Sequence, residues 1–398
     1  MRMKKYRQFL KLYLWITAVM ALPLLINLLF ITNAHEHTAI REIVKIQHEK
    51  NAIYGTALNQ NHFVHKIELV HHNKSRIIAL GSSRALGLRE EFFSTSFVNC
   101  GRAMNNLDNG KVFLAKLFLH HKPEVLLLVL DFWWFSDMFT QRETLDFYQK
   151  TGVELTLDKF IKPYDFLLSS KISPRDYLQI LLFRNDKNHI TNYNNLGLMA
   201  IKRSDGFRKD GSYLYASSIY GLAPQSQRSI GFNDNLDSKR RFEFGANISH
   251  KRLTALSEII KLCIDNNVAP VIIIPPVSSV IYQRMFSQQE KYGYVLRFQE
   301  YVKSLPVESY DFHDIKKVES TDCECIDGFH IGDVAYQKIL LKILNQNPSS
   351  VIRNYLNISL MERMVRENDG KVMTVYEADQ DKFNYREADF LKLGCQKN

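Results

Sequence analysis

Short apolar runs that end in polar turns constrain the fold of this chain more than any other feature. The runs Ile77–Leu80, Glu124–Leu130 and Val271–Ile274 suit fully buried strands. Two weaker runs, Ser96–Asn99 and Ser309–Phe312, predict two further strands. The segments between them have helical periodicity, and strands separated by helices form parallel sheets with right-handed crossovers. We therefore expect an α/β fold: a three-layer α/β/α sandwich with a parallel five-stranded sheet.

In a parallel sheet of this kind, ligands bind at the carboxyl ends of the strands. The residues that we expect at that edge are polar, glycine or proline: Ser83, Gly101, Asp131, Pro275, Asp327 and His330. The sequence therefore predicts one functional site at this edge of the sheet.

The turn Gly81-Ser82-Ser83 directly follows the first strand and precedes Ala85–Phe93, which we expect to be helical. A serine on a tight strand-to-helix turn projects its hydroxyl above the sheet edge. Its N–H lies at a helix N-terminus, where negative charge is favoured. Both properties suit a nucleophile that generates an oxyanion. The competing interpretation is an ordinary turn of an α/β domain.

A second motif changes the balance between these interpretations. Asp327 and His330 lie three residues apart, just before a helical run that includes Val334 and Ile339. A carboxylate at this spacing can accept the imidazole N–H and fix the tautomer. The other ring nitrogen is then free to take a proton from a serine. By itself Asp-x-x-His is typical of a solvated turn, but with Ser83 it predicts a Ser-His-Asp triad.

The composition describes a globular protein with a basic surface. The 398 residues are 45% hydrophobic and 24% charged, with a net charge of +10. Lysine and arginine are scattered rather than gathered in blocks, so we expect no nucleic-acid partner. A basic surface instead suits anionic lipid or an anionic envelope polymer.

A membrane segment is predicted near the N-terminus. From Leu12 to Ala34 the chain has no charged residue, which is enough for a helix to cross a bilayer. Basic residues precede this span, so the positive-inside rule places residues 1–11 in the cytoplasm and the rest outside. A cleaved signal peptide is the alternative, but the long span has no clear cleavage site near Asn33. We expect a single-pass anchor in the inner membrane, with membrane lipid as a partner and a periplasmic domain.

We expect residues 35–74 to form a polar, partly helical stalk and residues 75–345 to form the α/β domain. Irregular, loop-rich residues 136–245 predict an insertion that shapes a substrate cleft. Residues 346–398 are polar and charged and contain no recognisable motif.

The order of these motifs resembles the SGNH, or GDSL-like, hydrolase superfamily over about residues 75–345. Ser83 matches the nucleophile, Gly101 the oxyanion glycine of the second block, and Asp327 and His330 the last block. The third block normally supplies an oxyanion asparagine, but this chain has Asp131 followed by aromatic residues. With the N-terminal anchor, the pattern is more similar to the exported acyltransferase branch. That branch includes the alginate O-acetyltransferases and the D-alanine transfer protein of the teichoic acid pathway.

The resemblance implies a flavodoxin-like SGNH fold and a specific mechanism. His330 accepts the proton of Ser83, Asp327 holds the imidazole, and the N–H groups of Ser83 and Gly101 stabilise the oxyanion. The acyl group then passes to water or to a sugar hydroxyl of a cell-envelope glycan, and a membrane-bound O-acyltransferase is an implied partner. The alternative is a degenerate domain that binds a glycan or a membrane acyltransferase without chemistry.

Three further residues are candidates for substrate binding. Arg84 suits an anionic substrate or a structural role, and Asp131 opposes an oxyanion unless it points away, is hydrogen-bonded or is protonated. Trp133, with Trp134, suits stacking on a sugar, although aromatic clusters are more often core. His313 is a rival base, but it has no carboxylate three residues before it.

The five cysteines leave one unpaired if pairs form. Cys323, Cys325 and His330 have no fourth spaced ligand, so we expect neither a metal nor a cofactor. In the predicted fold, Cys100 lies at the same sheet edge as Cys323 and Cys325. A bridge from Cys100 to one of them, and an unpaired buried Cys100, are equally compatible with the sequence.

Overall fold

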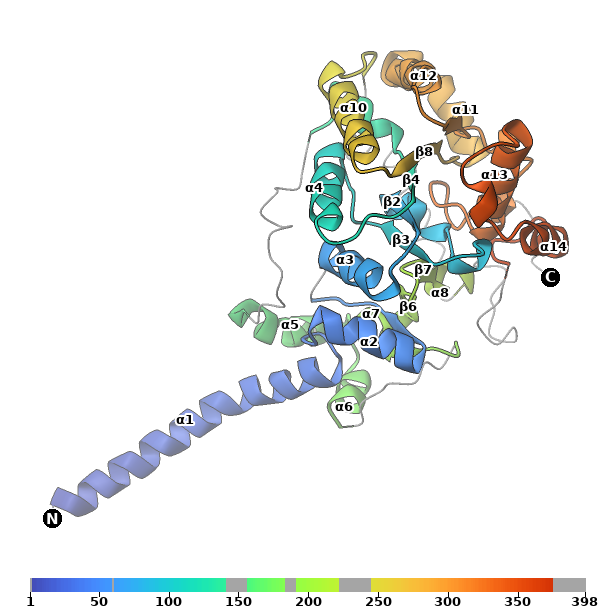
Figure 1. Cartoon of the computed structure of the whole chain (residues 1–398). Coiled ribbons are helices and arrows are strands. Elements are labelled where there is room, and N and C mark those ends of the chain that lie inside the picture. The colour runs from blue at the N-terminus through green and yellow to red at the C-terminus, as the bar shows by residue number, and fades with distance from the viewer. Residues whose placement is uncertain (1, 59–60, 141–155, 183–190, 222–244, 375–398) are drawn as a thin grey trace. The chain divides into compact units, whose positions relative to one another are not determined.

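The computed structural model describes residues 2–58, 61–140, 156–182, 191–221 and 245–374 (Figure 1). The chain divides into two compact units. One unit contains residues 1–61 and 152–206, and the other contains residues 62–151 and 207–398.

The larger unit contains the five-stranded sheet that the sequence predicts. Its strands run in the order β3-β2-β4-β8-β9, and every neighbouring pair is parallel. The parallel five-stranded sheet is therefore confirmed. The strands are β2 (Ile77–Gly81), β3 (Phe97–Gly101), β4 (Val125–Val129), β8 (Ala269–Ile274) and β9 (Ser309–Asp311).

One helix of this unit, α3, precedes the first strand, and the others lie between and after the strands. They are α3 (His62–Asn73), α4 (Leu107–Phe118), α8 (Ala216–Ile219), α10 (His250–Asp265), α11 (Ser279–Phe286), α12 (Gln289–Lys303), α13 (Asp333–Gln346) and α14 (Ile358–Asn368). The unit also contains β7 (Tyr213–Tyr215). Among the packed elements, α3 contacts β3, and α10 contacts both β8 and α4.

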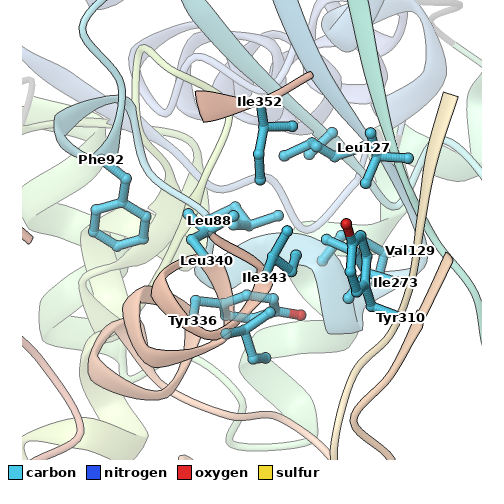
Figure 2. Packing of buried hydrophobic residues seen from close by; sticks show 14 of the residues in the cluster. Leu88, Phe92, Leu127, Val129, Ile273, Tyr310, Tyr336, Leu340, Ile343 and Ile352 are labelled. Atoms are coloured by element: carbon cyan, nitrogen blue, oxygen red, sulfur yellow. The ribbon is translucent and has the colours of Figure 1, made fainter. Parts of the chain in front are cut away.

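The core of this unit joins alternate residues of the strands to one face of α13. Leu127, Val129 and Ile273 point the same way because successive strand residues alternate between faces. Tyr336 and Leu340, one turn apart on α13, pack in the same cluster (Figure 2). Fully burying each aliphatic side chain contributes roughly 1.5–3 kcal/mol, so this cluster fixes α13 on the sheet.

The smaller unit begins with α1 (Arg2–Asn33), a single long helix (Figure 1). Its segment Lys5–Asn33 is long and apolar enough to cross a membrane, which is consistent with single-pass anchoring. The other elements are α2 (Ile40–Lys50), β1 (Ala52–Tyr54), α5 (Leu157–Leu168), α6 (Pro174–Leu182), β5 (Asn194–Leu196), α7 (Leu198–Arg203) and β6 (Asp205–Phe207), which reaches the unit boundary. Strands β1 and β5 pair in parallel.

The expected domain limits differ from those observed. Residues 35–61 of the expected stalk and residues 152–206 of the expected insertion share one compact unit, rather than forming a stalk and a loop region. Much of the expected loop region lies outside the described residues, as do residues 375–398. Residues 346–374 are not a polar extension: Ile352, Leu356 and Met361 are buried in the core of the larger unit.

Candidate active site

Ser83 lies just beyond the carboxyl end of β2. It begins a short 3₁₀ helix, η1 (Ser83–Gly87), and a second one, η2 (Glu90–Phe92), follows. The stretch Ala85–Phe93, which we expected to be helical, therefore forms parts of two short 3₁₀ helices and not one continuous helix. The Ser82 hydroxyl accepts the N–H of Arg84 at 3.1 Å, which closes the turn. Within the described residues the N–H of Ser83 donates no hydrogen bond, so it is available to a ligand.

The loop that carries Asp327 and His330 is held by its own backbone. The N–H groups of Ile326 and Asp327 donate to the carbonyl of His330 at 2.8 and 3.3 Å. Asp327 Oδ1 accepts the N–H groups of Phe329 and His330 at 2.9 and 2.8 Å. The motif therefore forms a tight loop before α13 rather than a turn of that helix.

This geometry joins the three predicted residues in one hydrogen-bonded chain. His330 Nδ1 donates to Asp327 Oδ2 at 2.7 Å, and His330 Nε2 lies 2.9 Å from Ser83 Oγ. With Nδ1 protonated, Nε2 is the acceptor for the serine proton. The arrangement can deliver a serine alkoxide to an electrophile while the imidazole holds the proton.

The Asp327 carboxyl is kept ionised. Its burial acts to raise the pKa, but His330 and the hydrogen bonds from the imidazole and two N–H groups outweigh that effect and lower it. An ionised carboxylate orients the ring and stabilises the imidazolium that forms when His330 takes a proton.

Arg84 lies behind the site rather than facing a substrate. Its side chain is 2% exposed, and its guanidinium donates only to groups inside the protein. Nε donates to the carbonyl of Phe329 at 3.1 Å, and the terminal nitrogens donate to Asp131 Oδ1 at 3.3 Å and to the carbonyls of Pro275 and Pro276 at 2.7 and 2.9 Å. Arg84 thus joins the serine turn to the histidine loop and to the end of β8. The expected binding of an anionic substrate by Arg84 is not met.

Asp131 is likewise internal. Its side chain is fully buried and pairs with Arg84, so it does not serve as a surface group for substrate. Burial raises the pKa of Asp131 to about 6, although Arg84 and a hydrogen bond from Ser82 oppose the shift. The carboxyl therefore carries a proton more readily than an ordinary aspartate.

Gly101 ends β3 at the register position of Gly81. Its N–H donates to Asn99 Oδ1 at 2.7 Å, so this donor is engaged within the protein and not directed at an oxyanion. Asn99 Nδ2 donates to the carbonyls of Ala85 and Leu88 at 2.7 and 2.8 Å. Asn99, which sequence reasoning did not select, therefore ties the end of β3 to the turn after Ser83.

The aromatic candidates divide by burial. Trp134 is fully buried and belongs to the core, whereas Trp133 is partly exposed and has the Arg84 guanidinium 5.5 Å from its ring. Tyr215, another residue that the sequence did not single out, is partly exposed and lies 5.5 Å from the His330 ring. The Tyr213 ring packs on Tyr215 at 4.6 Å between ring centroids. Alternating tyrosines in Tyr-Leu-Tyr were the available sequence signal.

His313 is not a rival base. It is fully buried among the rings of Phe132, Tyr282 and Phe286. Burial lowers the pKa of His313 to about 3, with Arg84 adding to the effect, so the ring is neutral at physiological pH.

The structure decides between the two alternatives for Cys100. Cys100 is a buried free thiol, so the unpaired alternative is correct and the bridge from Cys100 to Cys323 or Cys325 does not form. Burial raises the pKa of Cys100 to about 12, which makes the thiol unreactive. Cys323 takes part in a disulfide. Among the described residues, no group of three or more His, Cys, Asp or Glu side chains is arranged to hold a metal ion.

No protein-family model matches the chain, and no curated protein matches it.

Proposed function

We propose that this protein is a membrane-anchored serine acyl-ester hydrolase or O-acyltransferase of the SGNH type that acts on a cell-envelope glycan. The observation that carries the proposal is the hydrogen-bonded chain Ser83–His330–Asp327, with distances of 2.9 and 2.7 Å. Ser83 and His330 are 247 residues apart in the sequence. The three side chains nevertheless form hydrogen bonds in the order that proton transfer from a serine requires.

The proposed reaction follows from these positions. His330 Nε2 takes the Ser83 proton while Ser83 Oγ bonds to the acyl carbonyl carbon, and the N–H of Ser83 stabilises the oxyanion. A well-aimed donor of this kind contributes roughly 3 kcal/mol to the transition state. The leaving alkoxide then departs with the proton from His330, which leaves an acyl-serine. Water or a sugar hydroxyl gives its proton to His330 and bonds to the acyl carbon. The bond from that carbon to Ser83 Oγ then breaks, and His330 returns the proton to Ser83.

The fold and location form part of the same proposal. The strand order β3-β2-β4-β8-β9 supports a flavodoxin-like α/β/α sandwich, because flavodoxin has the chain order 2-1-3-4-5. The basic residues before Leu12 and the disulfide at Cys323 support an inner-membrane anchor with a periplasmic catalytic unit. Tyr215 beside His330 supports a sugar as acyl acceptor, because aromatic rings stack on apolar sugar faces. A membrane-bound O-acyltransferase as acyl donor rests on the family resemblance alone.

A second function, glycan binding or assembly with a membrane acyltransferase without chemistry, is favoured by one specific observation. The N–H of Gly101 is engaged by Asn99, and Leu130–Trp133 contain no asparagine that would replace it. An oxyanion would then have fewer donors than in a complete SGNH site.

A fluorophosphonate probe separates the two functions. The full chain in detergent should be labelled at Ser83, and both Ser83→Ala and His330→Ala should abolish labelling and ester turnover. The double variant should be no worse than either single one, because the two residues act as a unit. Ser257→Ala, on the exposed side of α10, is the matched control and should remain labelled. Labelling that persists in Ser83→Ala would overturn the catalytic assignment. Absent labelling, together with glycan binding unaffected by Ser83→Ala, would establish the second function.

A further inference from the structure

We propose that α5 and α6 form a second membrane element, a helix pair seated in the bilayer beside α1 with its exposed leucine and isoleucine side chains among the lipid acyl chains. The inference rests on α1 as the membrane anchor and is independent of the ester chemistry. All the contacts that support it lie within the smaller unit.

Two asparagines of α1 attach these helices to the anchor. Asn27 is fully buried, donates to the carbonyl of Phe160 at 2.5 Å and accepts the hydroxyl of Tyr177 at 2.6 Å. Asn33 donates to the carbonyl of Leu181 at 3.0 Å. An amide inside an otherwise apolar helix is costly in hydrocarbon unless it finds partners. Helices α5 and α6 provide those partners, which explains why the span tolerates both asparagines.

The attachment extends well into the apolar part of α1. The hydroxyl of Tyr164 on α5 donates to the carbonyl of Pro23 at 3.0 Å. From Pro23 to Asn33 the axis of α1 rises roughly 15 Å, about half the thickness of a hydrocarbon core. At this level α1 keeps other leucines exposed, namely Leu25 at 58% and Leu29 at 50%. The lipid that covers Leu25 and Leu29 therefore extends along the axis of α1 as far as the level of α5.

Both helices present apolar side chains away from their packed faces. Leu157, Ile161 and Leu168 of α5 share one stripe, because their spacing of four and seven residues returns to the same side of a helix. They are 67%, 52% and 89% exposed. On α6, Leu178 and Leu182 form an exposed pair one turn apart. Figure 1 shows α5 and α6 beside the end of α1 from which the chain continues.

A charged strip lies beside this apolar stripe on α5. Asp158, Lys159, Lys162 and Asp165 occupy it, and Lys162 pairs with Asp165 at 3.2 Å. An apolar stripe next to a lysine-containing polar strip is typical of helices that lie in a membrane interface. Continuity with the exposed leucines of α1 makes lipid the occupant of the stripe, in preference to a second copy of the chain or another protein.

Depth-dependent fluorescence tests this placement in the full-length protein. Single cysteines at Ile161 and Leu178 are labelled with a nitrobenzoxadiazole dye, and the label on the wild-type chain is subtracted as background. The protein is reconstituted into phosphatidylethanolamine–phosphatidylglycerol vesicles with or without doxyl-labelled lipid. Lys162→Cys on the polar face of α5 is the matched control, and Leu25→Cys reports on the anchor.

We expect doxyl lipid to quench dye at Ile161 and Leu178 at least twofold, as it quenches dye at Leu25, while dye at Lys162 is quenched by aqueous iodide instead. Quenching at Leu25 without quenching at Ile161 and Leu178 would overturn the inference and leave the anchor intact. Absence of quenching at Leu25 would overturn the anchor and the inference together. Dye at Ile161 that neither quencher reaches would show a protein occupant, which also overturns the inference.

Discussion

Arg84 Nε donates a hydrogen bond to the carbonyl of Phe329 at 3.1 Å. Arg84 follows the proposed nucleophile, and Phe329 precedes the proposed base. Their hydrogen bond therefore connects the two segments that carry Ser83 and His330. The other donors of Arg84 reach the end of β8 and Asp131, so one side chain sets the distance between the two halves of the site. The hydrogen bond between Ser83 and His330 in the proposed active site depends on this internal clamp.

Replacing the Arg84 side chain should destabilise the protein. Arg84→Met leaves the buried Asp131 without its cation, so we expect the free energy of unfolding to fall by about 3–5 kcal/mol. The measurement is urea unfolding of the full chain in detergent, followed by circular dichroism. Arg76→Met is the matched control, because its pair with Glu124 at 2.6 Å is half exposed, and it should shift the midpoint far less. Equal shifts for the two variants would contradict the clamp.

The raised pKa of Asp131 predicts a pH dependence of stability. Folded Asp131 has a pKa of about 6 against an ordinary 3.8, so between these values the folded state binds more protons than the unfolded state. The stability that this proton contributes is fully present below pH 4 and is lost as the pH rises through 6. The difference corresponds to at most about 3 kcal/mol.

Asp131→Asn should remove this component. As the pH rises from 4 to 7, the stability of the variant relative to the wild type should increase. The measurement is the thermal midpoint of both proteins across that range. The buried His313 acts in the opposite direction, because its lowered pKa costs stability as the pH falls from 6.5, so the comparison must be made between variants. Parallel profiles for wild type and Asp131→Asn would show that Asp131 does not titrate in this range.

Gly101 has no room for a side chain. A Cβ there would lie 2.7 Å from Leu86 Cδ2 and 2.8 Å from Asn99 Oδ1. Gly101→Ala should therefore destabilise the protein by about 1–3 kcal/mol and disturb the turn after Ser83. At Gly293, by contrast, the nearest atom would be Ala246 O at 3.5 Å, so Gly293→Ala within α12 should be neutral or slightly stabilising. Thermal unfolding of both variants distinguishes crowding from a general glycine effect.

Tyr215 offers a test of the proposed contact with a sugar. If its ring stacks on a sugar, Tyr215→Leu should raise KM for an acetylated glycan by roughly two- to tenfold, the range expected from aromatic contacts. Turnover of p-nitrophenyl acetate, which lacks the sugar, should change little. Tyr215→Phe keeps the ring and should behave like the wild type towards both substrates. A similar loss with both substrates would assign Tyr215 to positioning His330 instead.

The sequence sufficed for the centre of the sheet, because β2, β4 and β8 are local apolar runs. The shorter β9 followed from its place after a predicted helix. The sequence also sufficed to select Ser83, Asp327 and His330, since each follows a predicted strand or precedes a predicted helix. It could not show the partners of Arg84, because the carbonyls that it binds are 191 to 245 residues away and backbone carbonyls carry no residue identity.

The strands of the smaller unit could not be predicted from the sequence either. Strands β1 and β5 have three residues each, too few for a period of two to be recognised. The pairing of Cys100 was likewise open, because a common sheet edge places two residues near each other without fixing the directions of their side chains.

The 247 residues between Ser83 and His330 have a consequence for biosynthesis. Ribosomes add roughly 5–20 residues per second, so the serine precedes its histidine by an interval on the order of tens of seconds. Until the loop before α13 arrives, the hydroxyl has no base and keeps its ordinary weak reactivity. On the proposed function, the nascent chain therefore has no esterase activity until that loop has been made. The order of synthesis, rather than an inhibitor, would keep the unfinished chain inactive.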